Sequence, residues 1–429
     1  MILETNTRFD LLMTDHQFEL PVDYNQPEGE KIKVFAREVV EIARKDDKLP
    51  WLVYFQGGPG YPSPRPTAKS GWLKKALEKF RVLLLDQRGT GQSSVVNTQT
   101  LARFSSSQEK ADYLKHFRAD NIIRDAEAIR KELVGEKWSV LGQSFGGFCI
   151  MRYLSASPEG LKEAFITGGV PSMTRHIDDV YKATHASAKI KTDFYYSCYP
   201  NDKEKIKKIA SFINDNEVTL PSGDPLSVRR FQLIGASLGF ARGPEAIHYT
   251  IENAFVDGVN GEELNYEFLK AMDNECSFAT NPFYAVIHEA IYAQGFATNW
   301  SAERIRKQDP SFDQWDDQML FNGEMIGPWV FDEFKHLEPL REAAQILAEY
   351  EDWPMLYDME VLKNNTVPVA CVVYYNDFFV PQQYSMETVN AIPNMQAFVT
   401  SEYEHCGIGV DGERVLSKLQ GLTAGTLDR

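Results

Sequence analysis

A serine between glycines stands where a short, mainly apolar run passes directly into a longer one. Residues 142–146 are Gly-Gln-Ser-Phe-Gly; they follow the run 138–141 and precede residues 148–154, which contain no helix breaker. A sharp turn from a buried strand into a helix exposes a serine hydroxyl, and small flanking residues avoid collisions there. We therefore predict that Ser144 is a nucleophile and that the amide of Phe145 stabilises an oxyanion. Without this context the motif would be only a glycine-rich turn.

One histidine and one aspartate follow later strands in the order that such a nucleophile requires. Of the eight histidines, only His405 comes after a further strand beyond the apolar run 367–375, and Asp377 follows that run directly. A histidine can take the serine proton and return it to the leaving group, while a carboxylate orients the imidazole. Each residue alone has a plainer interpretation, such as a solvated histidine or a turn-capping aspartate. Their joint order favours a Ser144–His405–Asp377 triad.

Glycines also follow an earlier predicted strand. The apolar run 51–55 ends in Gln-Gly-Gly-Pro-Gly, residues 56–60. Because glycine lets a backbone amide approach a ligand closely, we predict that Gly57 or Gly58 supplies a second oxyanion donor beside Phe145. A simple tight turn is the alternative.

The next apolar run, residues 82–85, ends in Asp-Gln-Arg-Gly-Thr-Gly, which begins at Asp86. A carboxylate at the end of a strand could take part in catalysis. We expect instead that Asp86 holds the loop together with Arg88.

The elements that must position these residues alternate between strands and helices. Strands are expected at residues 18–24, 32–39, 51–55, 82–85, 138–141, 367–375 and 396–400, the first two as an antiparallel pair. Helices are expected at residues 72–80 and 121–134 and from about residue 412 onward. This alternation predicts an α/β fold with a mostly parallel, doubly wound central sheet and helices on both faces.

The long segment between the predicted strands 138–141 and 367–375 differs from the rest of the chain in composition. From about residue 173 to about residue 346 the chain is rich in helix formers and aromatics, and segments such as 281–306 have helical spacing. We expect a mostly helical cap domain, inserted into the core and placed over Ser144 as a lid. The predicted organisation is residues 1–172 as the first part of the core, 173–346 as the cap and 347–429 as the second part of the core.

The composition limits the classes of partner. The chain has 429 residues and a formal net charge of −16, which works against binding to nucleic-acid phosphates or anionic lipids. The Lys-rich stretch 189–208 also contains acidic residues and is expected to be a solvated helix face. No apolar run is long enough to span a bilayer. We expect neither a nucleic acid nor a membrane as partner.

The number and spacing of the cysteines indicate the cellular compartment. Their number, five, is odd, and they are scattered without the spacing of metal ligands. The first residues lack a basic segment followed by an apolar one. We expect reduced thiols, a cytoplasmic protein and no metal. A homo-oligomer is compatible with the sequence, which does not specify the oligomeric state.

Taken together, these stretches resemble the prolyl aminopeptidases (proline iminopeptidases) of the α/β-hydrolase superfamily, especially their longer bacterial type. The resemblance is carried by Leu-Pro-Val-Asp-Tyr at 20–24, Gln-Gly-Gly-Pro-Gly at 56–60, Asp-Gln-Arg-Gly-Thr-Gly at 86–91, Gly-Gln-Ser-Phe-Gly-Gly at 142–147 and Glu-His at 404–405. It implies an α/β-hydrolase fold and the release of N-terminal proline from small peptides without a cofactor. Gln56 departs from the histidine usual in shorter members of the family, which bears on hydrogen bonding in the loop.

A free N-terminal proline has a cationic amine beside an apolar ring, so its pocket requires a buried carboxylate near aromatic walls. By resemblance, Glu289 is the first choice for this carboxylate and Glu324 the second. The alternative is that both form ordinary salt bridges, for instance with Arg304 or Arg306. Side chains expected to enclose the ring are Phe145 and Phe240, with core packing as the alternative for Phe240.

Two other functions are compatible with the motifs. A carboxylesterase or amidase acting on small uncharged substrates would use the same triad without a carboxylate for the amine. A binding protein of the same fold that has lost catalysis is disfavoured by the intact set of serine, histidine and aspartate.

Overall fold

The central sheet of the computed structural model has nine strands in the order β1-β2-β3-β5-β4-β6-β7-β10-β11. The structure describes residues 1–259, 261–275 and 277–426. Pairing is antiparallel from β1 through β2 and β3 to β5, and parallel from β5 to β11. The strands are β1 (Ile2–Arg8), β2 (Leu11–Pro21), β3 (Lys31–Glu41), β4 (Trp51–Phe55), β5 (Arg81–Asp86), β6 (Trp138–Gln143), β7 (Leu161–Thr167), β10 (Val369–Tyr374) and β11 (Met395–Thr400).

The predicted strands are all present, and two strands of the sheet, β1 and β7, were not predicted. The antiparallel pair predicted at the start of the chain is extended by β1, which lies at the edge of the sheet beside β2. Its side chains are almost all exposed, so it has no apolar face that the sequence could reveal.

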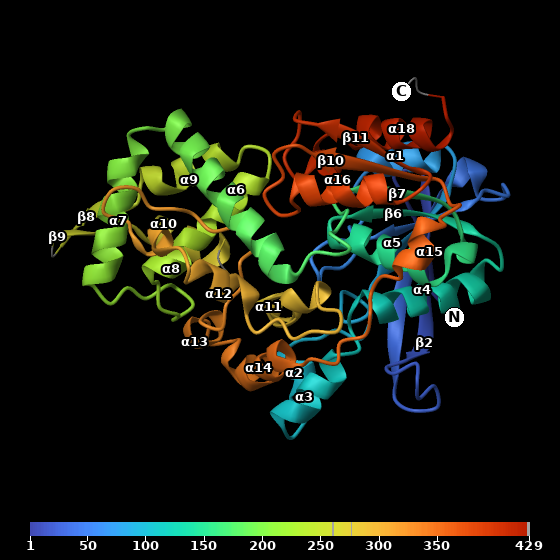
Figure 1. Cartoon of the computed structure of the whole chain (residues 1–429), viewed down its shortest axis with the longest axis horizontal. Helices are drawn as coiled ribbons and strands as arrows, with labels where there is room; N and C mark the ends of the chain where they lie inside the picture. Colours follow the sequence, from blue (N-terminus) through green and yellow to red (C-terminus); the bar gives the residue numbers. More distant parts are fainter. Residues whose placement is uncertain (260, 276, 427–429) are drawn as a thin grey trace.

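Helices cover the sheet and fill the segment between β7 and β10 (Figure 1). Those outside this segment are α1 (Gly71–Leu77), α2 (Thr98–Leu101), α3 (Ser107–Leu114), α4 (Ala119–Leu133), α5 (Phe145–Ala156), α16 (Gln382–Ala391), α17 (Gly407–Val410) and α18 (Gly412–Thr423). Those inside it are α6 (Ile177–Cys198), α7 (Asp202–Asp215), α8 (Val228–Phe231), α9 (Gly243–Glu252), α10 (Tyr266–Glu275), α11 (Pro282–Ile287), α12 (Ser301–Arg306), α13 (Val330–Glu333), α14 (Arg341–Glu349) and α15 (Met359–Lys363).

The two faces of the sheet pack against different helices because side chains alternate along each strand. Leu52 and Tyr54 of β4 belong to one buried cluster with side chains of α1 and α18. Val53 and Phe55 belong to the other, which contains side chains of α4, α5 and α16. The predicted α/β architecture with helices on both faces is therefore confirmed, and both faces are buried as a parallel sheet requires.

The segment between β7 and β10 is mainly helical, and Figure 1 shows its part from α6 to α14 to the left of and below the sheet, while α15 lies beside α5. It also contains a short hairpin of β8 (Phe255–Gly258) and β9 (Gly261–Leu264). The helical spacing noted at 281–306 corresponds to α11, the short 3-10 helix η4 (Glu289–Ile291) and α12, with an irregular segment from Tyr292 to Trp300 between η4 and α12.

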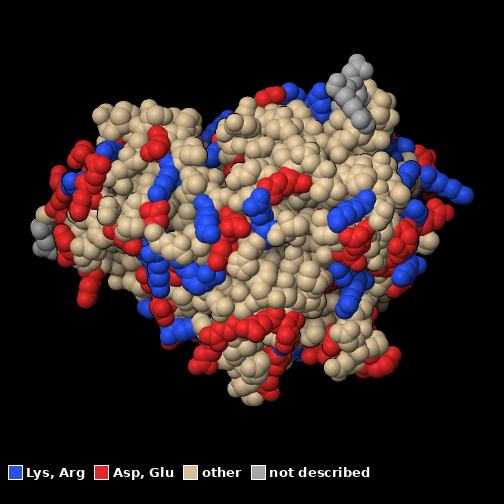
Figure 2. Space-filling view, in the orientation of Figure 1, with Lys and Arg blue, Asp and Glu red and all other residues tan. Residues whose placement is uncertain are grey.

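Charges are distributed over the surface. On the face in Figure 2, basic side chains are interspersed with acidic ones. Several lysines of the stretch 189–208 form ion pairs, as Lys203 does with Asp317 at 2.9 Å. Within the described ranges, no helix is both long and apolar enough to cross a membrane.

Candidate active site

Ser144 lies on a sharp turn between β6 and α5. Its backbone angles are φ 53° and ψ −123°, a conformation that a residue with a side chain rarely adopts and that costs about 1–3 kcal/mol. The turn is possible because its neighbours lack side chains. A Cβ atom on Gly146 would lie 2.0 Å from the carbonyl oxygen of Phe55, and one on Gly142 would lie 2.4 Å from that of Gly146. The two glycines are thus a steric requirement of this turn.

His405 and Asp377 form a buried pair. The distance between Nδ1 of His405 and Oδ2 of Asp377 is 2.8 Å, and their side chains are 4% and 2% exposed. The other carboxylate oxygen, Oδ1, accepts hydrogen bonds from the amides of Phe379 at 2.9 Å and Val380 at 3.0 Å. Three donors therefore fix the orientation of Asp377, and Asp377 in turn fixes that of the imidazole.

The surroundings of His405 favour its protonated form. Burial by itself lowers the pKa of an imidazole, but the charge and hydrogen bond of Asp377, together with Glu324 and Glu404, outweigh this effect and raise the pKa of His405. The ring of Phe379 packs edge-on against the imidazole, with centroids 5.1 Å apart. A histidine in this setting is suited to accept a proton and hold the resulting charge.

Ser144 and His405, which are far apart in the sequence, line the same cavity of about 340 Å³. Its wall is formed by residues of the loop after β4, of the turn at Ser144, of the segment 233–326 and of the loop after β11. Its lining comprises Gln56, Gly57, Gly58, Tyr61, Gln143, Ser144, Leu233, Ala236, Phe240, Glu275, Ser277, Phe278, Tyr284, Gly323, Glu324, Ile326 and His405. Such an arrangement can present an acyl group to a serine while keeping a general base beside it.

The loop after β4 lies against the serine turn. A Cβ on Gly57 would come within 2.4 Å of the side-chain oxygen of Gln143 and 2.9 Å of the Cβ of Ser144. Gly58 has φ +119°, a value that favours glycine. Gln56 accepts a hydrogen bond from the hydroxyl of Tyr54 at 2.9 Å, so its side chain is held within the loop. Gly57 thus lies beside the candidate nucleophile, and Gly58 lines the same cavity.

Glu324 reaches the cavity from the loop before α13. Its side chain is 31% exposed, and a carboxylate oxygen lies 3.8 Å from Nε2 of His288. Burial would raise the pKa of this carboxyl, but contacts with His288, His405 and Tyr284 outweigh it and lower the pKa. Glu324 is therefore a carboxylate available to a cationic ligand.

Glu289, the first choice from the sequence for the amine, is not brought to this cavity. Its two carboxylate oxygens accept hydrogen bonds from the amides of Ser301 at 3.0 Å and Ala302 at 2.9 Å, which open helix α12. Burial raises its pKa although these amides oppose the shift. Because helix amides already satisfy both oxygens, the choice of Glu289 over Glu324 was wrong.

The expected alternative for these two glutamates, a salt bridge to Arg304 or Arg306, is also not observed. Arg304 pairs with Asp178 at 2.6 Å, and Arg306 pairs with Asp313 at 2.7 Å.

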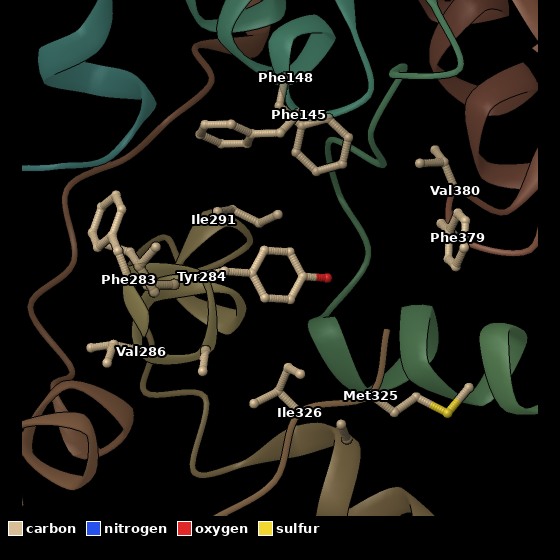
Figure 3. Close-up of a cluster of buried hydrophobic side chains, with 14 of the residues drawn as sticks. Phe145, Phe148, Phe283, Tyr284, Val286, Ile291, Met325, Ile326, Phe379 and Val380 are labelled. Atoms are coloured by element: carbon tan, nitrogen blue, oxygen red, sulfur yellow. The ribbon is translucent and has the colours of Figure 1, made fainter. Parts of the chain in front are cut away.

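The two predicted aromatic walls have different positions. Phe240 is 44% exposed, lines the cavity and packs against Phe379 with centroids 5.4 Å apart. Phe145 is buried and is not among the cavity-lining residues. Figure 3 shows its ring beside Phe148, facing Ile291 and Tyr284. The expectation that Phe145 encloses the substrate ring was therefore wrong for its side chain, which packs the first turn of α5 against the helical segment.

Several lining residues were missed by the sequence reasoning, among them Tyr61, Glu275 and Tyr284. Tyr284 and His288 are four residues apart and lie on one side of α11 and its continuation, with ring centroids 4.8 Å apart. That i, i+4 spacing was the only available sequence signal for the pair. Tyr61 follows the predicted glycine loop and could have been found by its position.

Asp86 has the predicted structural role with a different partner. Its oxygens accept hydrogen bonds from the amides of Ser63 at 3.0 Å and Gln92 at 2.8 Å and from Nη1 of Arg65 at 2.9 Å. Arg88 instead pairs with Asp125, at 2.6 Å between Nη2 and Oδ1. The choice of Arg88 as partner was wrong, since the loop turns its guanidinium toward α4.

Comparison with known proteins fits this geometry. Residues 50–204 match the family described as alpha/beta hydrolase fold. The chain is 46% identical to the proline iminopeptidase of Aeromonas sobria over 408 residues, covering 94% of this chain and 95% of that protein. The chain belongs to the proline iminopeptidase family. A second member, proline iminopeptidase aneH of Aspergillus aculeatus, is 35% identical over 97% of this chain and 94% of its own length.

The resemblance inferred from the short motifs is thereby confirmed, and it extends over nearly the whole chain. The matched region 50–204 contains Ser144 and both loop glycines, whereas His405 and Asp377 lie beyond it. Within the residues that the structure describes, no group of three or more histidine, cysteine, aspartate or glutamate side chains is arranged to hold a metal ion.

Proposed function

We propose that this member of the proline iminopeptidase family releases the N-terminal proline of small peptides, with Ser144, His405 and Asp377 as its triad. The observation that carries the proposal is one cavity that combines a strained serine, a histidine and the carboxylate of Glu324. The family names of the relatives from Aeromonas sobria and Aspergillus aculeatus support the same activity.

In the proposed mechanism His405 takes the proton of Ser144 as its Oγ attacks the prolyl carbonyl. The amides of Phe145 and of Gly57 or Gly58 donate hydrogen bonds to the resulting oxyanion. His405 then gives the proton to the leaving amine, and an acyl-enzyme remains on Ser144. His405 then takes a proton from a water molecule as the water oxygen attacks the acyl-enzyme, and returns that proton to Oγ of Ser144 as proline leaves. Asp377 stabilises the imidazolium formed in both steps.

Specificity for a free N-terminal amine follows from Glu324 in this proposal. Its carboxylate faces a wall that includes Tyr61, Phe278 and Tyr284, and Phe240 completes the apolar surroundings. A secondary ammonium would bind the carboxylate by a charge-assisted hydrogen bond while the pyrrolidine ring contacts the aromatics. An N-acetylated proline has no ammonium group and would lose this bond.

We further propose that residues 173–346 act as a cap domain over the core formed by residues 1–172 and 347–429. Support comes from the lining of the cavity, where Phe240 and Glu324 of the cap face Ser144 and His405 of the core. A cytoplasmic location and the lack of nucleic-acid, membrane and metal partners stay predictions. Among the described cysteines Cys149, Cys198, Cys371 and Cys406 are free, which accords with a reducing compartment.

The test compares kcat/KM for a proline arylamide and for its N-acetyl form. Wild type is expected to cleave only the free amine, and Ser144→Ala is expected to abolish turnover. Glu324→Gln should lower kcat/KM by about 10- to 100-fold, mainly through KM, because a bond to a charged group contributes about 1.5–3 kcal/mol.

Glu289→Gln is the matched control, since it neutralises a buried glutamate outside the cavity and should leave the KM of the folded enzyme unchanged. Equal turnover of the free and N-acetylated substrates would contradict the peptidase proposal and favour an esterase or amidase. Lack of turnover of both, with Ser144 still labelled by a fluorophosphonate, would point to another N-terminal residue.

A further inference from the structure

Three consecutive residues of the loop that carries His405 contact the cap. The carboxylate of Glu404 pairs with the ammonium of Lys191 on α6. The amide of His405 donates a hydrogen bond to the carbonyl oxygen of Gly239 at 3.0 Å. The sulfur of Cys406 accepts one from the amide of Ala241 at 3.1 Å. The cap therefore contacts the backbone of His405 and the side chains of the residues before and after it.

Lys191 differs from the other lysines of the stretch 189–208. Its side chain is only 8% exposed, whereas that of Lys189, which pairs with Asp309, is 42% exposed. The expectation of a solvated helix face is therefore wrong for Lys191. A buried ammonium is costly unless it is paired, and Glu404, 26% exposed, is the partner that the structure gives it. Such a pair fixes the position of the segment that carries Glu404.

The cap also reaches the imidazole through packing. Gly239 ends the 3-10 helix η3 (Gln232–Gly239), and a Cβ there would lie 2.3 Å from the ring of Phe379. Phe379 in turn packs against His405 and against Phe240 of the cap. The position of η3 is thereby linked to the position of the imidazole.

Lys191 also pairs with one of the charged groups around His405. The titratable groups that face the imidazole from the surrounding elements are Asp377 after β10, Tyr374 of β10, Glu324 of the cap, and Glu404 and Cys406 of its own loop. Three of these are carboxylates. The ammonium of Lys191 offsets the charge of Glu404, so its removal would leave that negative charge unpaired beside the base.

We propose that Lys191 is a positioning residue that acts through Glu404. It holds the imidazole of His405 where it can accept the proton of Ser144, so that the imidazole is correctly placed only when the cap is in place. The inference rests on the proposed function insofar as His405 is the general base. It assigns to the cap a role in catalysis besides substrate binding.

The decisive experiment measures the pH dependence of two reactions for wild type and Lys191→Met. One is kcat/KM for the proline arylamide, and the other is the rate of covalent labelling of Ser144 by a fluorophosphonate, which needs the base but no prolyl specificity. We expect Lys191→Met to lower kcat/KM about tenfold and to move the acid limb of both profiles upward by roughly half a pH unit. Lys191→Arg should restore much of the wild-type behaviour.

Glu404→Gln provides a second, opposite test, because removal of the negative charge should move the acid limb to lower pH. The matched control is Arg175→Met, which breaks the Arg175–Glu387 pair at 2.6 Å, a cap-to-core contact that does not involve the His405 loop. This variant should keep the wild-type acid limb.

An acid limb that stays at the wild-type pH in both Lys191→Met and Glu404→Gln would overturn the proposal, whatever happens to kcat. So would an equal shift in Arg175→Met. If the proposed prolyl activity itself were wrong, wild type would show no arylamide turnover, yet the labelling reaction would still report on Lys191.

Discussion

Replacement of Asp377 by asparagine should inactivate the protein without unfolding it. In the native structure Oδ1 of Asp377 accepts hydrogen bonds from the amides of Phe379 and Val380, while Oδ2 faces Nδ1 of His405 at 2.8 Å. An asparagine keeps the two backbone bonds only if its oxygen replaces Oδ1. Its NH₂ group then takes the place of Oδ2 and donates to Nδ1 of the imidazole.

The imidazole would thereby be held in the wrong tautomer. With Nδ1 as acceptor, Nε2 carries the proton and cannot accept the proton of Ser144. We expect kcat for the proline arylamide to fall about 10⁴-fold, equivalent to about 5.5 kcal/mol in the activation free energy. Because the two backbone bonds remain, the melting temperature should change little. Steady-state kinetics, fluorophosphonate labelling and a thermal melt measure these three quantities.

Asp377→Ala separates the tautomer effect from simple loss of charge. Alanine imposes no donor on Nδ1, so either tautomer can form, but the amides of Phe379 and Val380 lose their acceptor and stability should fall. Asparagine should therefore be at least as inactive as alanine while remaining the more stable variant. Retention of more than about 1% of wild-type kcat by Asp377→Asn would refute this reasoning.

Two further predictions concern pH and the serine turn. His405 acts as a base only when neutral, and its pKa is raised above the ordinary 6.5. We therefore expect kcat/KM to fall with decreasing pH, with a midpoint above pH 6.5. A midpoint below that value in the pH–rate profile would contradict the charge assignment. Gly146→Ala places a Cβ 2.0 Å from the carbonyl oxygen of Phe55. This change should destabilise the fold by about 4 kcal/mol or more, with loss of soluble or labelled protein. A wild-type melting curve would show that the turn is less constrained than its geometry indicates.

Local signals in the sequence were sufficient for the main framework. The run 51–55 coincides with β4, and the run before Ser144 coincides with most of β6, because buried parallel strands are nearly continuous in apolar residues. The edge strand β1 was missed for the opposite reason, since its exposed side chains carry no apolar pattern. The order of Ser144, Asp377 and His405 along the chain was equally visible, although their catalytic roles stay predictions.

Selection between Glu289 and Glu324 needed the tertiary structure. Both occur in apolar segments, so composition alone does not distinguish a carboxylate that caps a helix from one that faces a cavity. Only the position of α12 shows that the amides of Ser301 and Ala302 donate hydrogen bonds to both carboxylate oxygens of Glu289. The partner of Asp86 was decided in the same way, by a loop that brings Arg65 to it and directs Arg88 elsewhere.

The sequence by itself determined the α/β-hydrolase fold, the family and the identity of the candidate nucleophile, base and acid, because these depend on short motifs and on order along the chain. The tertiary structure alone decided that Glu324 rather than Glu289 lines the cavity of Ser144, and which residues between β7 and β10 contact the loop of His405. Those contacts join segments far apart in the chain, such as Lys191 of α6 with Glu404 of the loop after β11, and no local pattern encodes such a pairing.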